Sequence, residues 1–215
     1  MRTTSAFGQV GEAIQDEGRI VIVQGGTSAG KTYAVLQYLI LAAHKNSLEG
    51  LISIVSESLP HLRRGAMRDF FTILTANDMY RERQHNKSSH TYNIKKATFE
   101  FFSADQGDKL RGARRDFLFI NEANNIGYEA WSELFIRTRK WSIIDFNPVA
   151  EFWAHTEILG HPEEDFRDKV RFVKLNYTHN EALDQVTIDN IESRKHDPDW
   201  WQVYGLGEVG TPTGV

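Results

Sequence analysis

The sequence predicts an α/β fold in which a mostly parallel central sheet is flanked by helices. Short hydrophobic runs rich in β-branched residues recur along the chain, as is typical of strands buried on both faces. Helical segments separate these runs, so the connections are crossovers, which favour parallel pairing. Glycines and polar residues follow directly after the runs, at the edge where open parallel sheets bind ligands.

The N-terminal half of the chain predicts two strand–helix units. Residues 19–24 are mostly β-branched and bounded by glycines, which predicts a buried strand, and residues 31–44 continue as a helix without Gly or Pro. Residues 51–55 predict a second buried strand. Pro60 stands where it can open a helix, which we expect to run to about residue 74.

The C-terminal half adds further strands. Residues 91–94 and 98–102 predict two strands joined by a tight turn. Two hydrophobic strands follow, at residues 117–120 and 141–146. A helix is expected between them, over about residues 128–137. The alternating pattern of residues 170–177 predicts an edge strand.

Composition excludes several classes of protein. The 215 residues include no cysteine, which excludes a disulfide framework, a thiolate zinc site and a cysteine nucleophile. Lys and Arg number 25 against 29 Asp and Glu, and the net charge of −4 is unlike that of a small dedicated nucleic-acid binder. The longest aliphatic run, residues 38–43, is far shorter than the ~20 residues that span a bilayer. No repeat or linker interrupts the sequence, so we expect residues 1–215 to form one domain.

The segment GGTSAGKT matches the phosphate-binding pattern G-x-x-x-x-G-K-[ST] in full and predicts a P-loop NTPase of the RecA-like (ASCE) type. Its glycines let backbone N–H groups surround phosphate oxygens, next to a helix N-terminus. Lys31 is expected to reach the β- and γ-phosphates, and the Thr32 hydroxyl to bind Mg²⁺. The alternative, a glycine-rich turn, is weaker because the full pattern lies between a predicted strand and a predicted helix. The predicted nucleotide-binding residues are Gly25, Gly26, Thr27, Ser28, Ala29, Gly30, Lys31 and Thr32.

The strand at residues 117–120 ends in Asn121 and Glu122, which is the pattern of a Walker B segment. Glu122 is the predicted catalytic base because a carboxylate polarises the attacking water. Asn121 is a predicted metal-site residue, but it stands where an acidic residue usually braces Mg²⁺ and supplies no charge. Either Mg²⁺ affinity is lower, or a nearby carboxylate such as Asp145 compensates; Asn121→Asp is then expected to strengthen the response to Mg²⁺. The alternative is that Asn121 caps a helix.

Two further segments suggest roles in catalysis. Asn147, before Pro148, follows a hydrophobic strand and is expected to sense the γ-phosphate; the alternative is a simple turn. The basic segment at residues 109–116 includes Arg111 and can present an arginine finger or face DNA, although charge alone favours a solvated loop. The eight histidines lack metal-binding spacing and are expected mostly at the surface or as caps.

In this order and at these separations, the segments resemble the ATPase domain of the large terminase subunit of tailed bacteriophages, the motor that packages viral DNA. The closing segments and the Asn147-Pro148 block make the resemblance specific, since many families share a P-loop. The resemblance covers most of the chain, and the stretches that carry it are residues 22–32, 54–60, 111–112, 119–123, 142–148, 175–180 and 201–208.

This resemblance implies that the chain hydrolyses ATP, with Mg²⁺, to drive translocation of viral double-stranded DNA into a procapsid. It implies that Lys31 and Thr32 hold phosphate and Mg²⁺, and that Glu122 activates water. It further implies that Asn147 couples hydrolysis to movement and that Arg111 enters the site of a neighbouring subunit. The implied partners are viral double-stranded DNA, the portal protein, the small terminase subunit and further copies in a ring of about five. We expect no membrane partner, a location in the host cell cytoplasm, and a monomeric domain when dilute.

Two departures from the family keep other interpretations open. One is Asn121. The other is that no acidic cluster for a two-metal nuclease follows residue 208, so the chain is expected either to be an isolated ATPase domain or to act with a nuclease on another chain. The alternatives for function are another DNA-dependent P-loop ATPase, such as a helicase-like protein, and a nucleotide-dependent scaffold with little hydrolysis.

Overall fold

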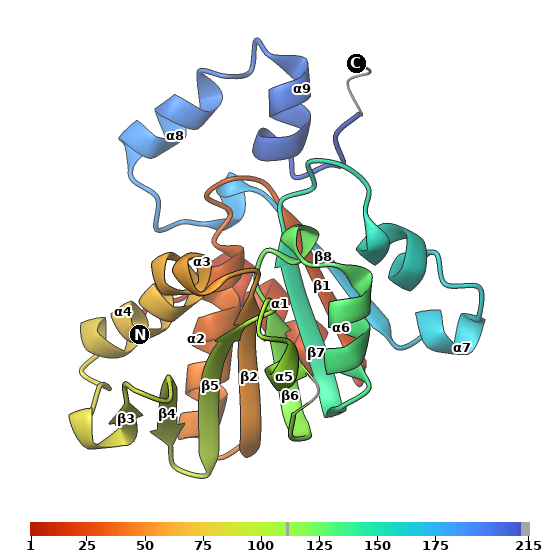
Figure 1. Ribbon diagram of the computed structural model, residues 1–215. Coiled ribbons are helices and arrows are strands. Elements are labelled where there is room, and N and C mark those ends of the chain that lie inside the picture. The colour runs from red at the N-terminus through yellow and green to blue at the C-terminus, as the bar shows by residue number, and fades with distance from the viewer. Residues whose placement is uncertain (111, 212–215) are drawn as a thin grey trace.

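A computed structural model describes residues 1–110 and 112–211 (Figure 1). Its described strands form one sheet in the order β3-β4-β5-β2-β6-β7-β1-β8. The strands are β1 (Ile20–Gly25), β2 (Gly50–Ser56), β3 (His85–Asn86), β4 (Thr91–Ile94), β5 (Ala97–Ser103), β6 (Arg115–Ile120), β7 (Thr138–Phe146) and β8 (Val170–Leu175). From β5 to β8 every neighbouring pair is parallel, whereas β3 and β4 are antiparallel. The predicted α/β class with a mostly parallel sheet is confirmed.

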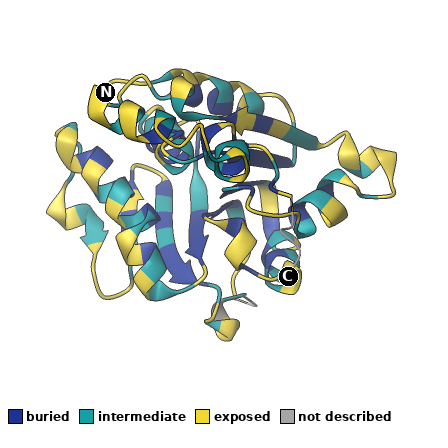
Figure 2. Cartoon of the chain, turned by 90° about the horizontal axis from the view of Figure 1, so that it is seen from above, coloured by how far each residue is buried: buried dark blue, intermediate teal, exposed yellow. Residues whose placement is uncertain are grey.

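Helices cover both faces of this sheet. The α-helices are α1 (Ser5–Gln15), α2 (Lys31–His44), α3 (Leu59–Arg64), α4 (Ala66–Ala76), α5 (Gly107–Leu110), α6 (Tyr128–Phe135), α7 (Glu164–Arg167), α8 (Gln185–Glu192) and α9 (Pro198–Trp200). Because side chains alternate along a strand, Val21 and Val23 join the core beneath α1, α2 and α4. Ile20 and Ile22 join the opposite core, beneath α6. Figure 2 shows these buried layers on the two sides of the sheet.

The helix predicted from Pro60 to about residue 74 is two helices, α3 and α4. The chain breaks between them at Gly65, where φ is −108° and ψ is −111°. Ser58 caps α3 by accepting a hydrogen bond from the backbone of His61 at 3.4 Å. The prediction was wrong here because an interior glycine was not weighed as a break, although it supports a helix poorly.

The sheet also differs from the sequence expectation at its edges and at β6. The hairpin of β4 and β5 is confirmed, but β5 pairs in parallel with β2 as well. The segment at residues 109–116 is not wholly a solvated loop, because Arg115 is 1% exposed. Its guanidinium donates to Ser53 Oγ and to the carbonyl of Leu134, both at 2.9 Å. The edge position of β8 is confirmed.

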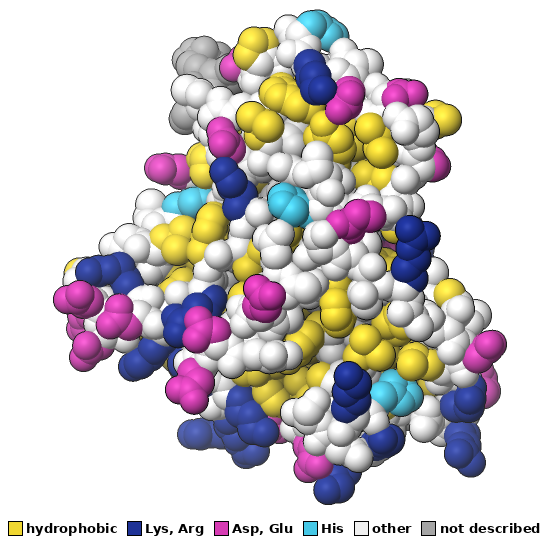
Figure 3. Space-filling model, turned by 180° about the vertical axis from the view of Figure 1, so that it is seen from behind, with side chains coloured by type: hydrophobic (Ala, Val, Ile, Leu, Met, Phe, Trp, Pro, Cys, Tyr) yellow, Lys and Arg dark blue, Asp and Glu magenta, His cyan; other side chains and the backbone are white. Residues whose placement is uncertain are grey.

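The C-terminal segment, residues 176–211, lies above the carboxyl ends of the strands and carries α8 and α9 (Figure 1). Seen from behind, hydrophobic side chains gather on this upper part of the molecule (Figure 3). Val186 and Leu206 are exposed hydrophobic residues of the C-terminal segment. Across the described residues, the helices are too short or too polar to traverse a lipid bilayer.

Candidate active site

The loop between β1 and α2 is held at its first half by the end of β8 and by the C-terminal segment. The backbone N–H of Gly26 donates to the carbonyl of Leu175 at 3.1 Å, and that of Thr27 donates to the carbonyl of Tyr204 at 2.8 Å. A Cβ on Gly25 would lie 2.6 Å from the Leu175 carbonyl oxygen, and one on Gly26 would clash with that of Tyr204. Glycine is therefore required at both positions by the close approach of backbone.

The second half of the loop turns into α2 with its helix N-terminus exposed to the pocket. Ser28 and Gly30 have left-handed backbone, with φ of 54° and 76°. The Asn180 side chain donates to the Ser28 carbonyl at 2.8 Å and holds this turn. Within the described chain no side chain caps α2, so its first N–H groups can receive an anion.

A pocket of about 260 Å³ lies over this loop at the carboxyl ends of β1, β6 and β7. The structure brings six predicted site residues to it from three segments of the chain, as the strand-end rule predicts. Its lining residues are Thr27, Ser28, Lys31, Thr32, Glu122, Asn124, Asn125, Asp145, Phe146, Asn147, Val149 and Tyr204. Their catalytic and binding roles stay predictions.

Lys31 is poised inside the pocket. Its Nζ donates to the Gly26 carbonyl at 2.9 Å and to Asn147 Oδ1 at 2.6 Å. Burial lowers the pKa of Lys31 to about 8, although the charges of Asp145 and Glu122 oppose that shift. Because its hydrogen-bond partners here are neutral oxygens, a phosphate can replace them without breaking an ion pair.

Asp145, near the end of β7, is 1% exposed and accepts several of the hydrogen bonds of the site. Its Oδ2 accepts from the Thr32 hydroxyl at 2.6 Å, and its Oδ1 accepts from the backbone N–H of Glu122 at 2.7 Å. Burial raises the pKa of Asp145, while these hydrogen bonds and the charge of Lys31 act in the opposite direction. The carboxylate thus touches the residue expected to ligate Mg²⁺.

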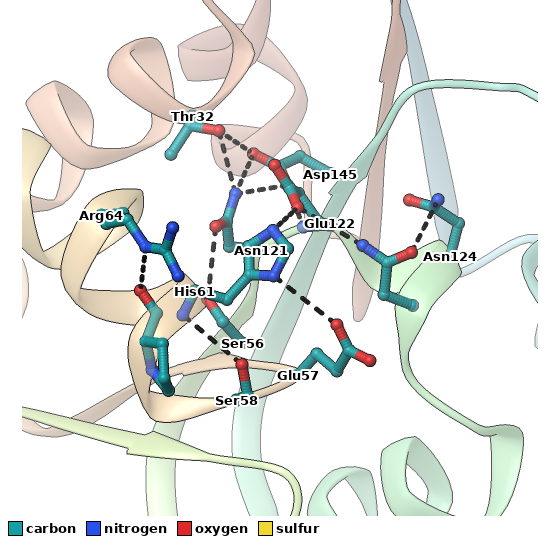
Figure 4. Close-up of polar contacts among 12 residues, drawn as sticks. Thr32, Ser56, Glu57, Ser58, His61, Arg64, Asn121, Glu122, Asn124 and Asp145 are labelled. Carbon is teal, nitrogen blue, oxygen red and sulfur yellow. Dashed lines mark hydrogen bonds and ion pairs between the residues drawn. The ribbon is translucent and has the colours of Figure 1, made fainter.

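Asn121 lies beside Asp145 and points toward Thr32 (Figure 4). Its Nδ2 donates to Thr32 Oγ1 at 3.0 Å and to both oxygens of Asp145 at 3.0 and 3.3 Å. Its Oδ1 accepts from Ser56 at 3.3 Å. In the described structure the short helix after β6, η2 (Ala123–Asn125), has no side-chain cap, so the helix-capping alternative for Asn121 is wrong.

Glu122 has left-handed backbone, with φ and ψ both 55°. A non-glycine residue there costs on the order of 1–3 kcal/mol, and such strain is found at functional sites. The side chain is 48% exposed, and its Oε2 lies 2.8 Å from His61 Nε2. The other ring nitrogen of His61 is 3.6 Å from Glu57.

Sequence reasoning missed the contact of His61 with the predicted base. It placed the histidines mostly at the surface or as caps, and His61 is indeed 44% exposed. His61 lies soon after the end of β2, which neighbours β6 in the sheet. That position could have indicated a place near the site. Arg111, the predicted finger, lies outside the described residues.

The site suits Mg²⁺ by the chemistry of its donors. A threonine hydroxyl and a carboxylate are hard oxygen donors, and Mg²⁺ in nucleotide sites typically uses one or two protein groups together with phosphates and waters. Over the residues that the structure describes, no cluster of His, Asp and Glu could hold a metal ion by itself. The arrangement therefore fits a metal that arrives with a nucleotide.

Comparison with known proteins gives a consistent result. A family model described as phage terminase large subunit matches residues 17–208. No curated protein sequence matches the chain.

Solved structures of large terminases share the fold. The large terminase of a thermophilic bacteriophage, called below the thermophilic-phage terminase, is similar with a TM-score of 0.77 and 16% identity over 96% of this chain and 53% of that one. For the HK97 bacteriophage large terminase the TM-score is 0.72, with 12% identity over 97% of this chain and 51% of that one. The large terminase ATPase domain of Thermus phage P74-26 gives a TM-score of 0.62, with 15% identity over 96% and 99% of the two chains. The chain spans about half the length of the thermophilic-phage and HK97 terminases.

Proposed function

The chain belongs to the phage terminase large subunit family, and we propose on that premise that it hydrolyses ATP to drive viral double-stranded DNA into a procapsid. The observation that carries this proposal is the convergence of Lys31, Thr32, Glu122 and Asn147 on one pocket over a P-loop. The thermophilic-phage terminase has been solved with ADP and with ATP-γ-S, which supports a nucleotide in the corresponding place.

The residues of the pocket divide the work of hydrolysis. The loop N–H groups and Lys31 would bind the β- and γ-phosphates, and Thr32, with Asn121 beside it, would hold a Mg²⁺ that neutralises phosphate charge. Glu122 orients a water and takes its proton while the water oxygen bonds to the γ-phosphorus. The bond from that phosphorus to the bridging oxygen breaks, and ADP and phosphate leave.

Asn147 is the proposed coupling residue. It bonds Lys31 Nζ at 2.6 Å, so it loses or keeps that partner according to whether phosphate is bound. The next residue, Pro148, accepts a hydrogen bond from the backbone of Gly210 at 2.9 Å. A shift of Asn147 is therefore transmitted to the C-terminal segment that covers the loop.

The partners belong to the same proposal. We infer that the chain acts on viral double-stranded DNA in the host cytoplasm, docked on the portal protein and supplied with DNA by the small terminase subunit. In a ring of about five copies, Arg111 would complete the site of the neighbouring subunit.

The test is ATPase activity of the chain with Mg²⁺, alone, with double-stranded DNA, and with procapsids that carry a portal. Glu122→Gln is the matched control, because it keeps the shape of the side chain and removes the base. Turnover that depends on Glu122 and rises with portal-bearing procapsids is expected. A rise with DNA alone would instead favour a helicase-like ATPase, and binding without turnover would favour a scaffold.

A further inference from the structure

We propose that Asp145 supplies the negative charge that braces Mg²⁺, in place of the residue at position 121. The carboxylate of the metal site has in effect moved from the end of β6 to the end of the neighbouring strand β7. This inference rests on the proposed function, because it concerns the metal that accompanies ATP.

Strand register places the two residues side by side. β6 and β7 are parallel, and Ile120 pairs with Ile144. Asn121, the first residue after β6, and Asp145, the next-to-last residue of β7, therefore lie at the same level. β7 also neighbours the P-loop strand β1, with Asp145 opposite Val23. The Asp145 carboxylate reaches Thr32 directly: Thr32 Oγ1 lies 2.6 Å from Asp145 Oδ2 and 3.0 Å from the Asn121 side chain.

The chemistry of the pair determines which atoms face Thr32. An ionised carboxylate only accepts hydrogen bonds, so the amide of Asn121 must turn its NH₂ group toward Asp145. Its oxygen then faces the Ser56 hydroxyl, 3.3 Å away. Asn121 thus presents donors to the metal side of the pocket, and a cation is not attracted to them. Asp145 is the neighbouring oxygen donor that carries charge.

The remaining carboxylate of the pocket is turned elsewhere. Of the residues that line the pocket in the described structure, Asp145 and Glu122 are the acidic ones. Glu122 is half exposed and contacts His61 at 2.8 Å. Asp145 is buried and bonded to Thr32. The two carboxylates therefore have separate tasks, one at the metal and one at the water.

This arrangement changes what is expected of Asn121. A second carboxylate at position 121 would lie within about 3 Å of the first in a buried site, where two like charges cannot both be ionised easily. Asn121→Asp is then expected to weaken metal binding, the opposite of the expectation from sequence. Asn121 is a positioning residue whose two N–H groups hold the Asp145 carboxylate against Thr32.

The experiment measures binding rather than turnover. The affinity of Mn²⁺ for the complex of the chain with ATP-γ-S is followed by electron paramagnetic resonance, and ATP-γ-S affinity is measured with and without Mg²⁺. The variants are Asp145→Asn, Asn121→Asp and the exchange Asn121→Asp with Asp145→Asn. Asp116→Asn is the matched control, because Asp116 lies at the opposite end of β6 and accepts from the Leu51 backbone.

We expect Asp145→Asn to weaken Mn²⁺ binding by about tenfold or more while metal-free ATP-γ-S affinity is kept. The exchange variant restores one carboxylate and one amide, so it should recover most of the lost affinity. Unchanged Mn²⁺ affinity in Asp145→Asn overturns the inference. If that variant does not fold, the exchange variant decides: recovered affinity supports the inference, and a folded exchange variant without it overturns it. A parental chain that binds no ATP-γ-S at all contradicts the proposed function itself, and the inference with it.

Discussion

The pocket and the aromatic edge of the sheet are built from opposite kinds of side chain. The aromatic edge comprises Phe70, Phe71, Tyr80, His85, Tyr92, Phe99 and Phe101, from α4, β3 to β5 and the segment between α4 and β3. Phe70 lies at its centre, with ring centroids 4.9 Å from Phe99 and 5.1 Å from Phe101. In and beside the pocket the side chains are instead polar: Lys31 is half-buried, and Asp145 and Asn121 are buried and joined by hydrogen bonds.

The difference shows that residues which stabilise the fold and residues which serve the site lie in different parts of one sheet. Aromatic packing gains free energy of folding from area removed from water and from ring contacts. Buried charges gain little for folding even when they are paired, because their desolvation is costly. Substitutions in the pocket should therefore change activity more than stability, and substitutions at the aromatic edge should do the reverse.

The largest expected effect is that of Lys31→Ala. Removing the ammonium group leaves the β- and γ-phosphates without their buried counter-charge, so nucleotide binding or turnover should be lost. The thermal midpoint without nucleotide should stay the same or rise, because a costly buried charge is gone. Parental nucleotide affinity and rate in this variant would contradict the assignment of the pocket.

Phe70→Ala should produce the reverse pattern. The side chain is fully buried, and such a truncation costs about 3–5 kcal/mol of the free energy of unfolding. Denaturant unfolding measures this loss. ATP turnover per folded molecule should stay close to the parental value at low temperature. A large loss of turnover without loss of stability would show that the two regions are coupled.

The pH dependence of nucleotide affinity is the next effect in size. Because the pKa of Lys31 is about 8 rather than its ordinary 10.5, the free chain loses this positive charge above pH 8. ATP-γ-S affinity should fall by about tenfold per pH unit there, until the pKa of the complex is reached. Folding has the opposite sign: between pH 8 and 10.5 the unfolded state binds more protons at this lysine, so its contribution to stability rises with pH.

Because nucleotide affinity and folding stability respond to pH with opposite signs, one titration distinguishes the two effects. ATP-γ-S affinity and the thermal midpoint without nucleotide are measured on the same samples from pH 7 to about 9.5. Affinity that stays constant over this range would show that Lys31 keeps its proton and that burial does not govern its charge.

The smallest expected effect is at His61, on the helix that leads from the pocket toward the aromatic edge. His61→Ala frees the Glu122 side chain, so kcat should fall. The fall should be about tenfold or less, because contacts between half-exposed charged groups contribute little. ATP-γ-S affinity should not change, since His61 is not among the pocket-lining residues. His61→Gln keeps an N–H donor and should recover part of the rate. Equal rates in all three proteins would remove any positioning role.

Local sequence patterns predicted those site residues whose position is fixed by the end of one strand. Lys31, Glu122 and Asn147 each directly follow a strand or its adjoining loop, so the rule that ligands bind at strand ends was enough to group them. The orientation of Asn121 depends on the register of β6 against β7, and no local pattern contains register. His61 reaches Glu122 from α3, which begins soon after β2, and no local pattern contains the fact that β2 lies beside β6 in the sheet.

The same distinction applies to the fold. The hairpin of β4 and β5 was visible because a tight turn joins adjacent segments. The pairing of β5 with β2 was not, because it joins strands about 47 residues apart, as Ser53 and Glu100 are. Arg115 was expected in a basic loop because its charge was read without the two acceptors that Ser53 and Leu134 bring from other segments.

The support of the phosphate loop by residues 204–207 has a consequence for synthesis on the ribosome. Gln24 donates to the carbonyl of Gly207 at 2.8 Å across a separation of 183 residues, and Thr27 depends similarly on Tyr204. The loop is therefore translated well before the residues that support its backbone. Contacts this distant in sequence form late in folding. A nascent chain thus cannot hold a finished phosphate loop until residues 204–207 have emerged.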